Sequence, residues 1–166
     1  MMATPHFITR TGRQTTELGQ KIGKLLRADI LPDFPGKGFH MALNGDLGAG
    51  KTTFVQGLAR GLNVPESYYI TSPTFNIINE YPCDGRALCH IDLYRLGAAD
   101  ELEFTGFQDL LDQGNILIVE WPQMLMDDDF FFDLVLDFHL TENFSRKISF
   151  SGSGQPASNL LQNLFS

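Results

Sequence analysis

Residues 45–52 read Gly-Asp-Leu-Gly-Ala-Gly-Lys-Thr, the G-x-x-x-x-G-K-[ST] pattern of a loop that holds the phosphates of a nucleoside triphosphate. The sequence predicts a short apolar strand before this loop, over residues 39–43, and a helix after it, over residues 53–62. Glycine permits the tight turns that aim successive N–H groups inward, and the helix adds the positive end of its dipole. The alternative is an ordinary glycine-rich turn that binds no ligand, and the strand and helix predicted on either side disfavour it. The pattern therefore predicts a nucleotide-binding domain.

Each residue of this P-loop has an expected role. The phosphate-binding set is predicted to be Gly45, Asp46, Leu47, Gly48, Ala49, Gly50, Lys51, Thr52 and Thr53. The ammonium of Lys51 is expected to reach the β- and γ-phosphates, which also makes it a catalytic candidate. The hydroxyl of Thr52 is placed to ligate the Mg²⁺ that accompanies the nucleotide.

Length and charge limit the number of domains and the classes of partner that the chain can have. The chain has 166 residues, of which 43% are hydrophobic, and this suits one core. We expect a single ATPase domain over residues 1–150, then a linker (151–156) and a short C-terminal helix or tail within 151–166. The net charge of −8 disfavours direct binding to nucleic acid or to an anionic membrane. Residues 1–13 lack a signal-like apolar region, and no long apolar stretch occurs, so a cytoplasmic location is expected.

The remaining pattern predicts an α/β fold, a three-layer P-loop NTPase-like domain with a mixed parallel/antiparallel central sheet. Its sheet should be parallel near the P-loop and antiparallel towards the edges. A first helix is expected after a cap at Thr15 or Thr16. Strands are predicted over 6–9, 75–81, 87–92, 116–119, 131–139 and 146–150, and helices over 100–111 and 160–165. Cys83 and Cys89 are expected to be small buried residues and not metal ligands.

Two acidic residues are candidates to complete the site. Glu120 follows the aliphatic run at 116–119, where a P-loop protein carries its magnesium anchor. Its alternative is a solvated carboxylate at the end of a strand. Asp92 ends a less purely apolar strand, and it could instead cap the turn that follows. Which of the two carboxylates orients the attacking water stays open.

A further candidate is Thr74, in the segment Ser72-Pro73-Thr74. Its hydroxyl could meet the metal or the γ-phosphate and order the loop only in the triphosphate state. An ordinary Ser-Pro turn before a strand is the alternative, and spacing does not decide between them. His90 and His139 are predicted to be ordinary strand residues, and Trp121 a packing residue.

Five motifs together resemble one family. They are residues 45–54, 72–75, 90–96, 101–104 with Gly106, and 119–122, in that order. This combination resembles the bacterial TsaE (YjeE) family, the ATPase subunit of the machinery that makes threonylcarbamoyladenosine in tRNA. The resemblance spans roughly residues 18–122.

The resemblance implies an ATPase that is weak alone and works with TsaB and TsaD partners. TsaD would transfer the threonylcarbamoyl group to adenosine 37 of tRNAs that read ANN codons, and ATP hydrolysis would reset the TsaB–TsaD complex between turnovers. It also implies Mg²⁺ binding through Thr52 and Glu120, with Asp92 needed for hydrolysis. The tRNA would be held by the partners, and no membrane would be involved.

Three other functions remain alternatives at this point. A small-molecule kinase of P-loop type would need an arginine-bearing lid, and only Arg95 and Arg146 are isolated candidates. A guanine-specific switch would need an N-K-x-D or T-K-x-D segment, which the sequence lacks. A nucleotide sensor that does not hydrolyse would leave Asp92 and Glu120 without a role.

Overall fold

The computed structural model describes the chain except residues 1–2, 74–75, 95, 97–101, 103 and 127–129. Its described strands form one seven-stranded sheet in the order β1-β7-β6-β2-β5-β4-β3. The strands are β1 (His6–Thr9), β2 (Phe39–Asn44), β3 (Ile78–Cys83), β4 (Arg86–Asp92), β5 (Ile116–Glu120), β6 (Leu134–Leu140) and β7 (Arg146–Gly152).

The central strand is β2, the one that leads into the P-loop. It pairs in parallel with β5 on one side and with β6 on the other, and β4 is parallel to β5. The outer pairs β3–β4, β6–β7 and β1–β7 are antiparallel. The β3–β4 hairpin turns at Asp84 and Gly85, both with positive φ, as a tight hairpin turn requires. The predicted mixed sheet is therefore confirmed.

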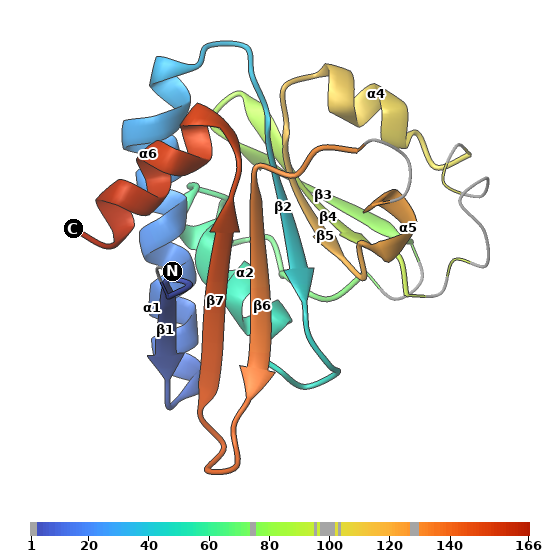
Figure 1. Cartoon of the computed structure of the whole chain (residues 1–166). Coiled ribbons are helices and arrows are strands. Elements are labelled where there is room, and N and C mark those ends of the chain that lie inside the picture. Colours follow the sequence, from blue (N-terminus) through green and yellow to red (C-terminus); the bar gives the residue numbers. More distant parts are fainter. Residues whose placement is uncertain (1–2, 74–75, 95, 97–101, 103, 127–129) are drawn as a thin grey trace.

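Helices cover both faces of this sheet (Figure 1). One face carries α1 (Gly12–Leu25), α2 (Lys51–Gly61) and α6 (Gly154–Leu164); the other carries α4 (Phe107–Asp112) and α5 (Gln123–Met126). Two short turns, η1 (Leu26–Ile30) and η2 (Leu31–Asp33), follow α1. Within the described residues, no helix has both the length and the apolar character needed to cross a membrane.

The P-loop helix α2 is fixed by unusually close packing against α1. A β-carbon on Gly57 would lie 2.0 Å from the carbonyl oxygen of Thr16, and one on Gly19 would lie 2.3 Å from that of Phe54. Only glycine lets the two backbones approach this closely. Because α1 also contributes Leu18 and Ile22 to the core on this face of the sheet, it holds α2 in place behind the loop.

Two helix predictions need correction. The helix α1 begins at Gly12 and is capped by Thr11, whose side chain accepts a hydrogen bond from the Gln14 N–H. Thr15, one of the predicted caps, instead lies buried inside the helix and bonds the Thr9 hydroxyl at 2.8 Å. Of the helix predicted over 100–111, residues 107–111 lie in α4, whereas residues 104–106 form a turn; residues 100, 101 and 103 lie outside the described part.

The C-terminal segment also differs from the prediction. The stretch 151–156, predicted as a linker, completes β7 at Gly152 and begins α6 at Gly154. Ala157, Leu160 and Leu164 of α6 are buried in the same core as α1 and α2. The sequence predicted only the second half of this helix, because residues 154–159 include Gly154 and Pro156 and show no apolar periodicity.

Both cysteines are free and buried, as predicted. Cys83 belongs to the core on the α1/α2 face, whereas Cys89 belongs to the core on the α4 face. Burial raises the pKa of the Cys83 thiol to about 11 and that of Cys89 to about 12. The two thiols therefore act as small apolar side chains in two separate cores.

Candidate nucleotide-binding site

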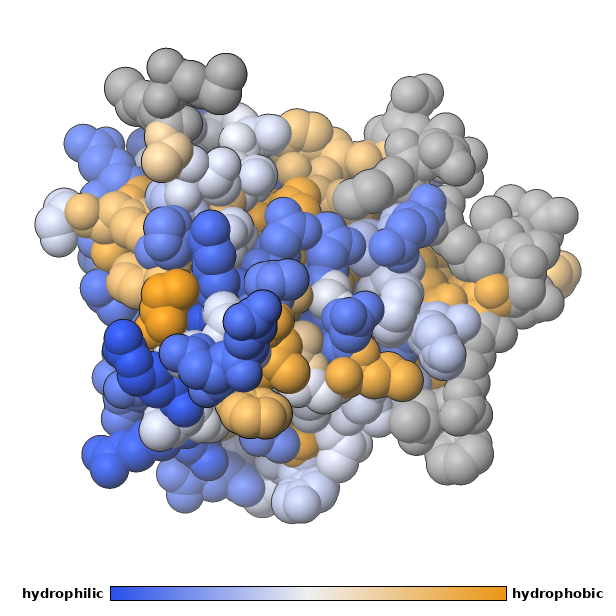
Figure 2. Space-filling view, turned by 60° about the horizontal axis from the view of Figure 1, so that its bottom comes forward, coloured by the Kyte–Doolittle hydropathy of each residue, from blue (hydrophilic) through white to orange (hydrophobic). Residues whose placement is uncertain are grey.

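The P-loop connects the carboxyl end of β2 to the first residue of α2. Gly45, Gly48 and Gly50 have φ values of 149°, 80° and 103°, which side chains disfavour. A β-carbon on Gly45 would also lie 2.8 Å from the carbonyl oxygen of Phe138 in β6. The glycines are thus required by the turn itself and by the neighbouring strand. Figure 2 brings this end of the sheet forward, where hydrophilic and hydrophobic residues are interspersed.

The first turn of α2 offers hydrogen-bond donors to an anion. The residue before the helix is Gly50, so no side chain caps it. The N–H groups of Lys51, Thr52 and Thr53 have no carbonyl partner within the helix, as holds for the start of any α-helix. With the helix dipole behind them, these donors fit the phosphates of a nucleotide.

Lys51 is buried at the mouth of the loop. Its ammonium donates a hydrogen bond to the carbonyl oxygen of Gly45 and lies 3.9 Å from Glu120 Oε1. It also stands 4.6 Å from the centre of the Trp121 ring, a cation–π contact. Only 6% of Lys51 is exposed, so its charge is held at the loop by three neighbours.

Sheet register brings both predicted carboxylates to this site. Leu43, the residue before the last of β2, pairs with Glu120 of β5, and Glu120 pairs with Asp92 of β4. Paired residues of adjacent strands project to the same face of a sheet. Leu43 packs in the core beneath α1 and α2, so Glu120 and Asp92 also face the P-loop helix.

Glu120 is almost completely buried, with 4% of its surface exposed. Its Oε2 lies 2.5 Å from Nε2 of His90, and its Oε1 faces Lys51. Glu120 is therefore no solvated carboxylate at a strand end, the alternative raised by the sequence. His90 is fully buried and bonded to the candidate metal anchor, so the prediction of an ordinary strand residue is wrong.

Asp92 is half-buried beside Glu120. Its Oδ1 accepts the Tyr94 N–H at 3.0 Å, which is the turn cap considered from the sequence. Its Oδ2 accepts a hydrogen bond from the Ser72 hydroxyl at 3.4 Å. Burial raises the pKa of Asp92, and the negative charge of Glu120 adds to this, against the lowering effect of the Tyr94 N–H. The structure thus gives Asp92 a structural bond without removing it from the site.

The donor set suits Mg²⁺. Thr52 lies in the first turn of α2, and Glu120 and Asp92 lie on the neighbouring strand ends. Among the described residues, no group of three or more His, Cys, Asp or Glu forms a metal cage. Mg²⁺ characteristically uses one or two carboxylates and completes its shell with phosphate oxygens and water. Thr74, the remaining predicted ligand, lies outside the described residues.

Arg146 is a site residue that sequence reasoning did not place. It begins β7, and its Nε donates a hydrogen bond to the carbonyl oxygen of Ala49 at 3.1 Å. A β-carbon on Gly50 would lie 2.7 Å from that Nε, so the guanidinium lies directly against the loop. The only sequence signal was an arginine at the start of a strand; its proximity follows from β6 pairing with β2.

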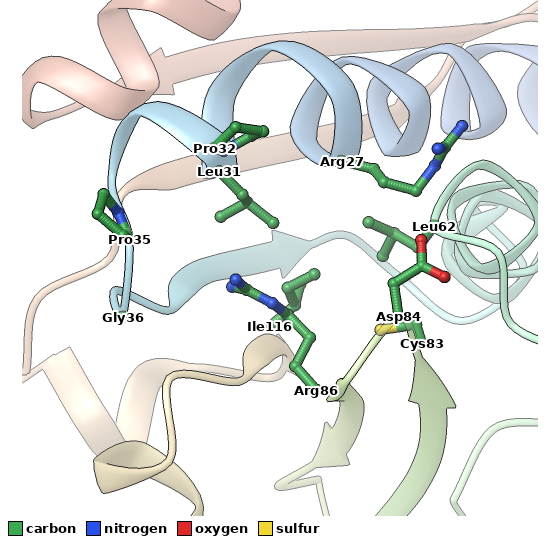
Figure 3. Close-up of a pocket in the computed structure, with 10 residues that line it drawn as sticks. All are labelled: Arg27, Leu31, Pro32, Pro35, Gly36, Leu62, Cys83, Asp84, Arg86 and Ile116. Carbon is green, nitrogen blue, oxygen red and sulfur yellow. The ribbon is translucent and has the colours of Figure 1, made fainter.

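A separate pocket of about 460 Å³ lies where β4 and β5 begin, lined in part by Arg27, Arg86 and Ile116 (Figure 3). Arg27 Nε donates to the Gly61 carbonyl oxygen at 3.2 Å. Arg86 Nη1 donates to the carbonyl oxygens of Lys37 and Gly114, at 3.1 and 3.2 Å. The two guanidinium groups point away from one another, and each bonds a backbone carbonyl oxygen.

Comparison with protein families assigns the chain. Residues 9–148 match the family described as "Threonylcarbamoyl adenosine biosynthesis protein TsaE". The chain belongs to the TsaE family. The match includes the P-loop, Asp92, Glu120 and the first residues of β7, so it covers every described residue of the site above.

Individual TsaE-family proteins agree. A protein of Aquifex aeolicus named tRNA threonylcarbamoyladenosine biosynthesis protein TsaE is 36% identical over 141 residues, 85% of this chain and 91% of that protein. A Haemophilus influenzae protein of the same name is 37% identical over 103 residues, 62% of this chain and 64% of that protein. The second match spans less than two thirds of the relative. The crystal structure of Bacillus subtilis YdiB superposes with a TM-score of 0.73 and 26% identity, covering 99% of this chain and 96% of that one.

Proposed function

We propose that this TsaE-family protein binds ATP with Mg²⁺ and hydrolyses it to ADP and phosphate. The observation that supports the proposal most is the buried pair of Lys51 and Glu120, 3.9 Å apart at the mouth of the P-loop. A loop that only held phosphate would need the lysine and the backbone N–H groups. A carboxylate kept beside that lysine, away from solvent, suits a metal-dependent reaction.

In this proposal the chain's own groups divide the work. The N–H groups of α2 and the ammonium of Lys51 neutralise the phosphate oxygens, and Thr52 and Glu120 hold the metal. Mg²⁺ held there would supply positive charge to offset the negative charge that develops in the transition state. Asp92, half-buried next to Glu120, would accept a hydrogen bond from the attacking water.

We further propose a role in tRNA modification, because the relatives' names place them in threonylcarbamoyladenosine biosynthesis. Hydrolysis would reset a TsaB–TsaD-like complex between turnovers. The net charge of −8 supports indirect contact with tRNA, since such a chain repels a phosphate backbone and its partners would hold the RNA.

The test measures ATP turnover by the purified chain, alone and with TsaB- and TsaD-like proteins, at fixed ionic strength. We expect slow turnover alone and a higher rate with partners. Arginine groups that partners supply to stabilise transition-state charge contribute about 10³–10⁵-fold. Repeated cycles of tRNA modification should require this chain and ATP.

Glu120→Gln is the matched control, because it keeps the shape of the side chain and deletes its charge. This variant should still bind ATP and should lose turnover. Full turnover in the variant would move the metal anchor to Asp92. Rapid turnover by the isolated chain, together with unchanged threonylcarbamoyladenosine in tRNA after its depletion, would refute the proposal. Phosphate transfer to one of a panel of small acceptors would favour the kinase alternative.

A further inference from the structure

We propose that His90 is a positioning residue for Glu120: its Nε2–H bond fixes one carboxylate oxygen and turns the other toward Lys51 and the P-loop. This inference rests on the proposed function, since it assigns a purpose to the orientation of the candidate metal anchor. Sequence reasoning gave His90 no role, and its place on the sheet argues for one.

The sheet places His90 for this task. It pairs with Ile118 of β5 and lies two residues before Asp92, so it projects to the same face as Glu120. From there the ring reaches Glu120 diagonally across the two strands, and Nε2 lies 2.5 Å from Oε2. The ring is fully buried, and 4% of Glu120 is exposed, so water does not compete for this bond.

The direction of the bond follows from the chemistry of the two groups. An ionised carboxylate only accepts hydrogen bonds, so the proton of the bond belongs to Nε2. Nδ1 is buried without a partner among the described residues. In the tautomer that protonates Nε2, Nδ1 carries a lone pair and leaves no donor unpaired.

The unpaired Nδ1 is also informative about why a histidine stands there. An apolar side chain in this core position would bury no unpaired polar atom, and its neighbours Leu88 and Ile118 are fully buried apolar residues. The histidine therefore costs stability at Nδ1, and what it provides in return is the bond at Nε2. That bond ends on the one carboxylate that also faces Lys51.

A fixed carboxylate binds a metal better than a rotating one. With Oε2 held by His90, Oε1 stays directed at the Lys51 side of the site, 3.9 Å from the ammonium. Hydrogen bonds to metal ligands from the surrounding protein typically change metal affinity or activity by about 10–100-fold. His90 should therefore affect the step that needs Mg²⁺ and leave the grip of the P-loop on the phosphates unchanged.

The test compares two substitutions of similar length. In His90→Gln the side-chain amide lies as many bonds from the backbone as Nε2 and can still donate; His90→Met fills the space without a donor. Leu88→Met, on the same strand and face, controls for the introduction of methionine into this core. Calorimetry measures ATP affinity with and without Mg²⁺, and turnover is measured alongside.

We expect His90→Met to lose about 10–100-fold in turnover and in the gain of affinity that Mg²⁺ provides, with Mg²⁺-free ATP affinity unchanged. His90→Gln should recover most of both, and Leu88→Met should match the wild type. Equal behaviour of the Gln and Met variants, or an equal loss of Mg²⁺-free affinity, would overturn the positioning role.

A nitrogen NMR spectrum of the His90 ring in the wild-type protein tests the bond without any turnover. It should show a protonated Nε2, and a bare Nε2 would refute the proposal even if a variant fails to fold. If the wild-type chain does not bind ATP, the proposed function fails, while the spectrum still decides whether the His90–Glu120 bond exists.

Discussion

Charged side chains have different partners at the two ends of the parallel strands. At the carboxyl ends of β2, β4 and β5, Lys51 and His90 are buried and both contact the buried carboxylate of Glu120. At the amino ends, Arg27 Nε and Arg86 Nη1 donate to backbone carbonyl oxygens beside the pocket that both arginines line. These hydrogen bonds give both arginines a structural role at this end of the sheet.

The helix α2 explains the contrast, because it runs from one end to the other. Its N-terminus carries a partial positive charge and unpaired N–H groups, which suit an anion. Its C-terminus carries unpaired carbonyl groups, and the guanidinium of Arg27 bonds the Gly61 oxygen there. The proposed phosphate site thus lies at one end of the domain, and at the other end arginine side chains bond the backbone.

Removing the cation at the P-loop end should have the largest effect. Lys51→Ala deletes the charge that meets the phosphates, and we expect ATP affinity to fall by about 100-fold or more, since charged hydrogen bonds are the strong ones. Calorimetry checks this. Arg27→Ala, which removes a cation at the far end of α2, is the control and should keep wild-type affinity. Unchanged ATP affinity in Lys51→Ala would contradict the assignment of the phosphate site to this end of the strands.

Thr52→Ala should separate the contribution of the metal to ATP affinity from that of the phosphate contacts. The substitution removes one metal ligand and keeps the backbone N–H groups, so binding of Mg²⁺-ATP should weaken by about tenfold. Metal-free ATP should bind almost as before. Calorimetry in magnesium and in a chelator measures both, and equal losses in the two conditions would argue against the metal role of Thr52.

Arg86→Ala should act on stability alone. It removes the donor from the carbonyl oxygens of Lys37 and Gly114 and should lower the free energy of unfolding by about 1–2 kcal/mol. Urea denaturation measures the change, and ATP affinity of the folded variant should equal that of the wild type. A loss of ATP affinity without a loss of stability would make this pocket a ligand site.

Asp92→Asn should give the smallest change in stability, and with the opposite sign. Because burial raises the folded-state pKa of Asp92 above 3.8, ionising it costs stability as the pH rises from about 3.8 through the folded pKa. Asparagine removes that cost, so the metal-free variant should have a slightly higher Tm than the wild type at pH 7. Thermal unfolding at several pH values checks whether the gain disappears in acid.

Asp92→Asn should also turn over ATP more slowly. The stability that Asp92 loses on ionising would then be tied to its function. A side chain whose ionised form is disfavoured by the fold, yet is kept, suits a site that uses the charge. Full ATPase activity in a folded Asp92→Asn protein would reduce Asp92 to the turn cap that its bond to the Tyr94 N–H already provides.

Local pattern predicted the elements that carry their own signal. The P-loop glycines, the apolar run of β5 and the hairpin around Gly85 each depend on neighbours in sequence, and the structure has them where the pattern put them. Patterning failed where the signal was weak or spread out. The cap Thr11 was missed because three threonines stand close together, and the first half of α6 was missed because it contains Gly154 and Pro156.

The amino-acid sequence alone shows the motif of a phosphate-binding loop and two strands that end in acids, because the strand–loop–helix pattern is local. In the folded chain β4 lies beside β5, and β6 lies beside β2. This order brings His90 to Glu120 and Arg146 to Ala49. Alternation along a strand fixes which face a side chain takes, but no residue in the strand states which strand will be its neighbour. Strand order comes from packing the whole core, and it gave both residues their place at the site.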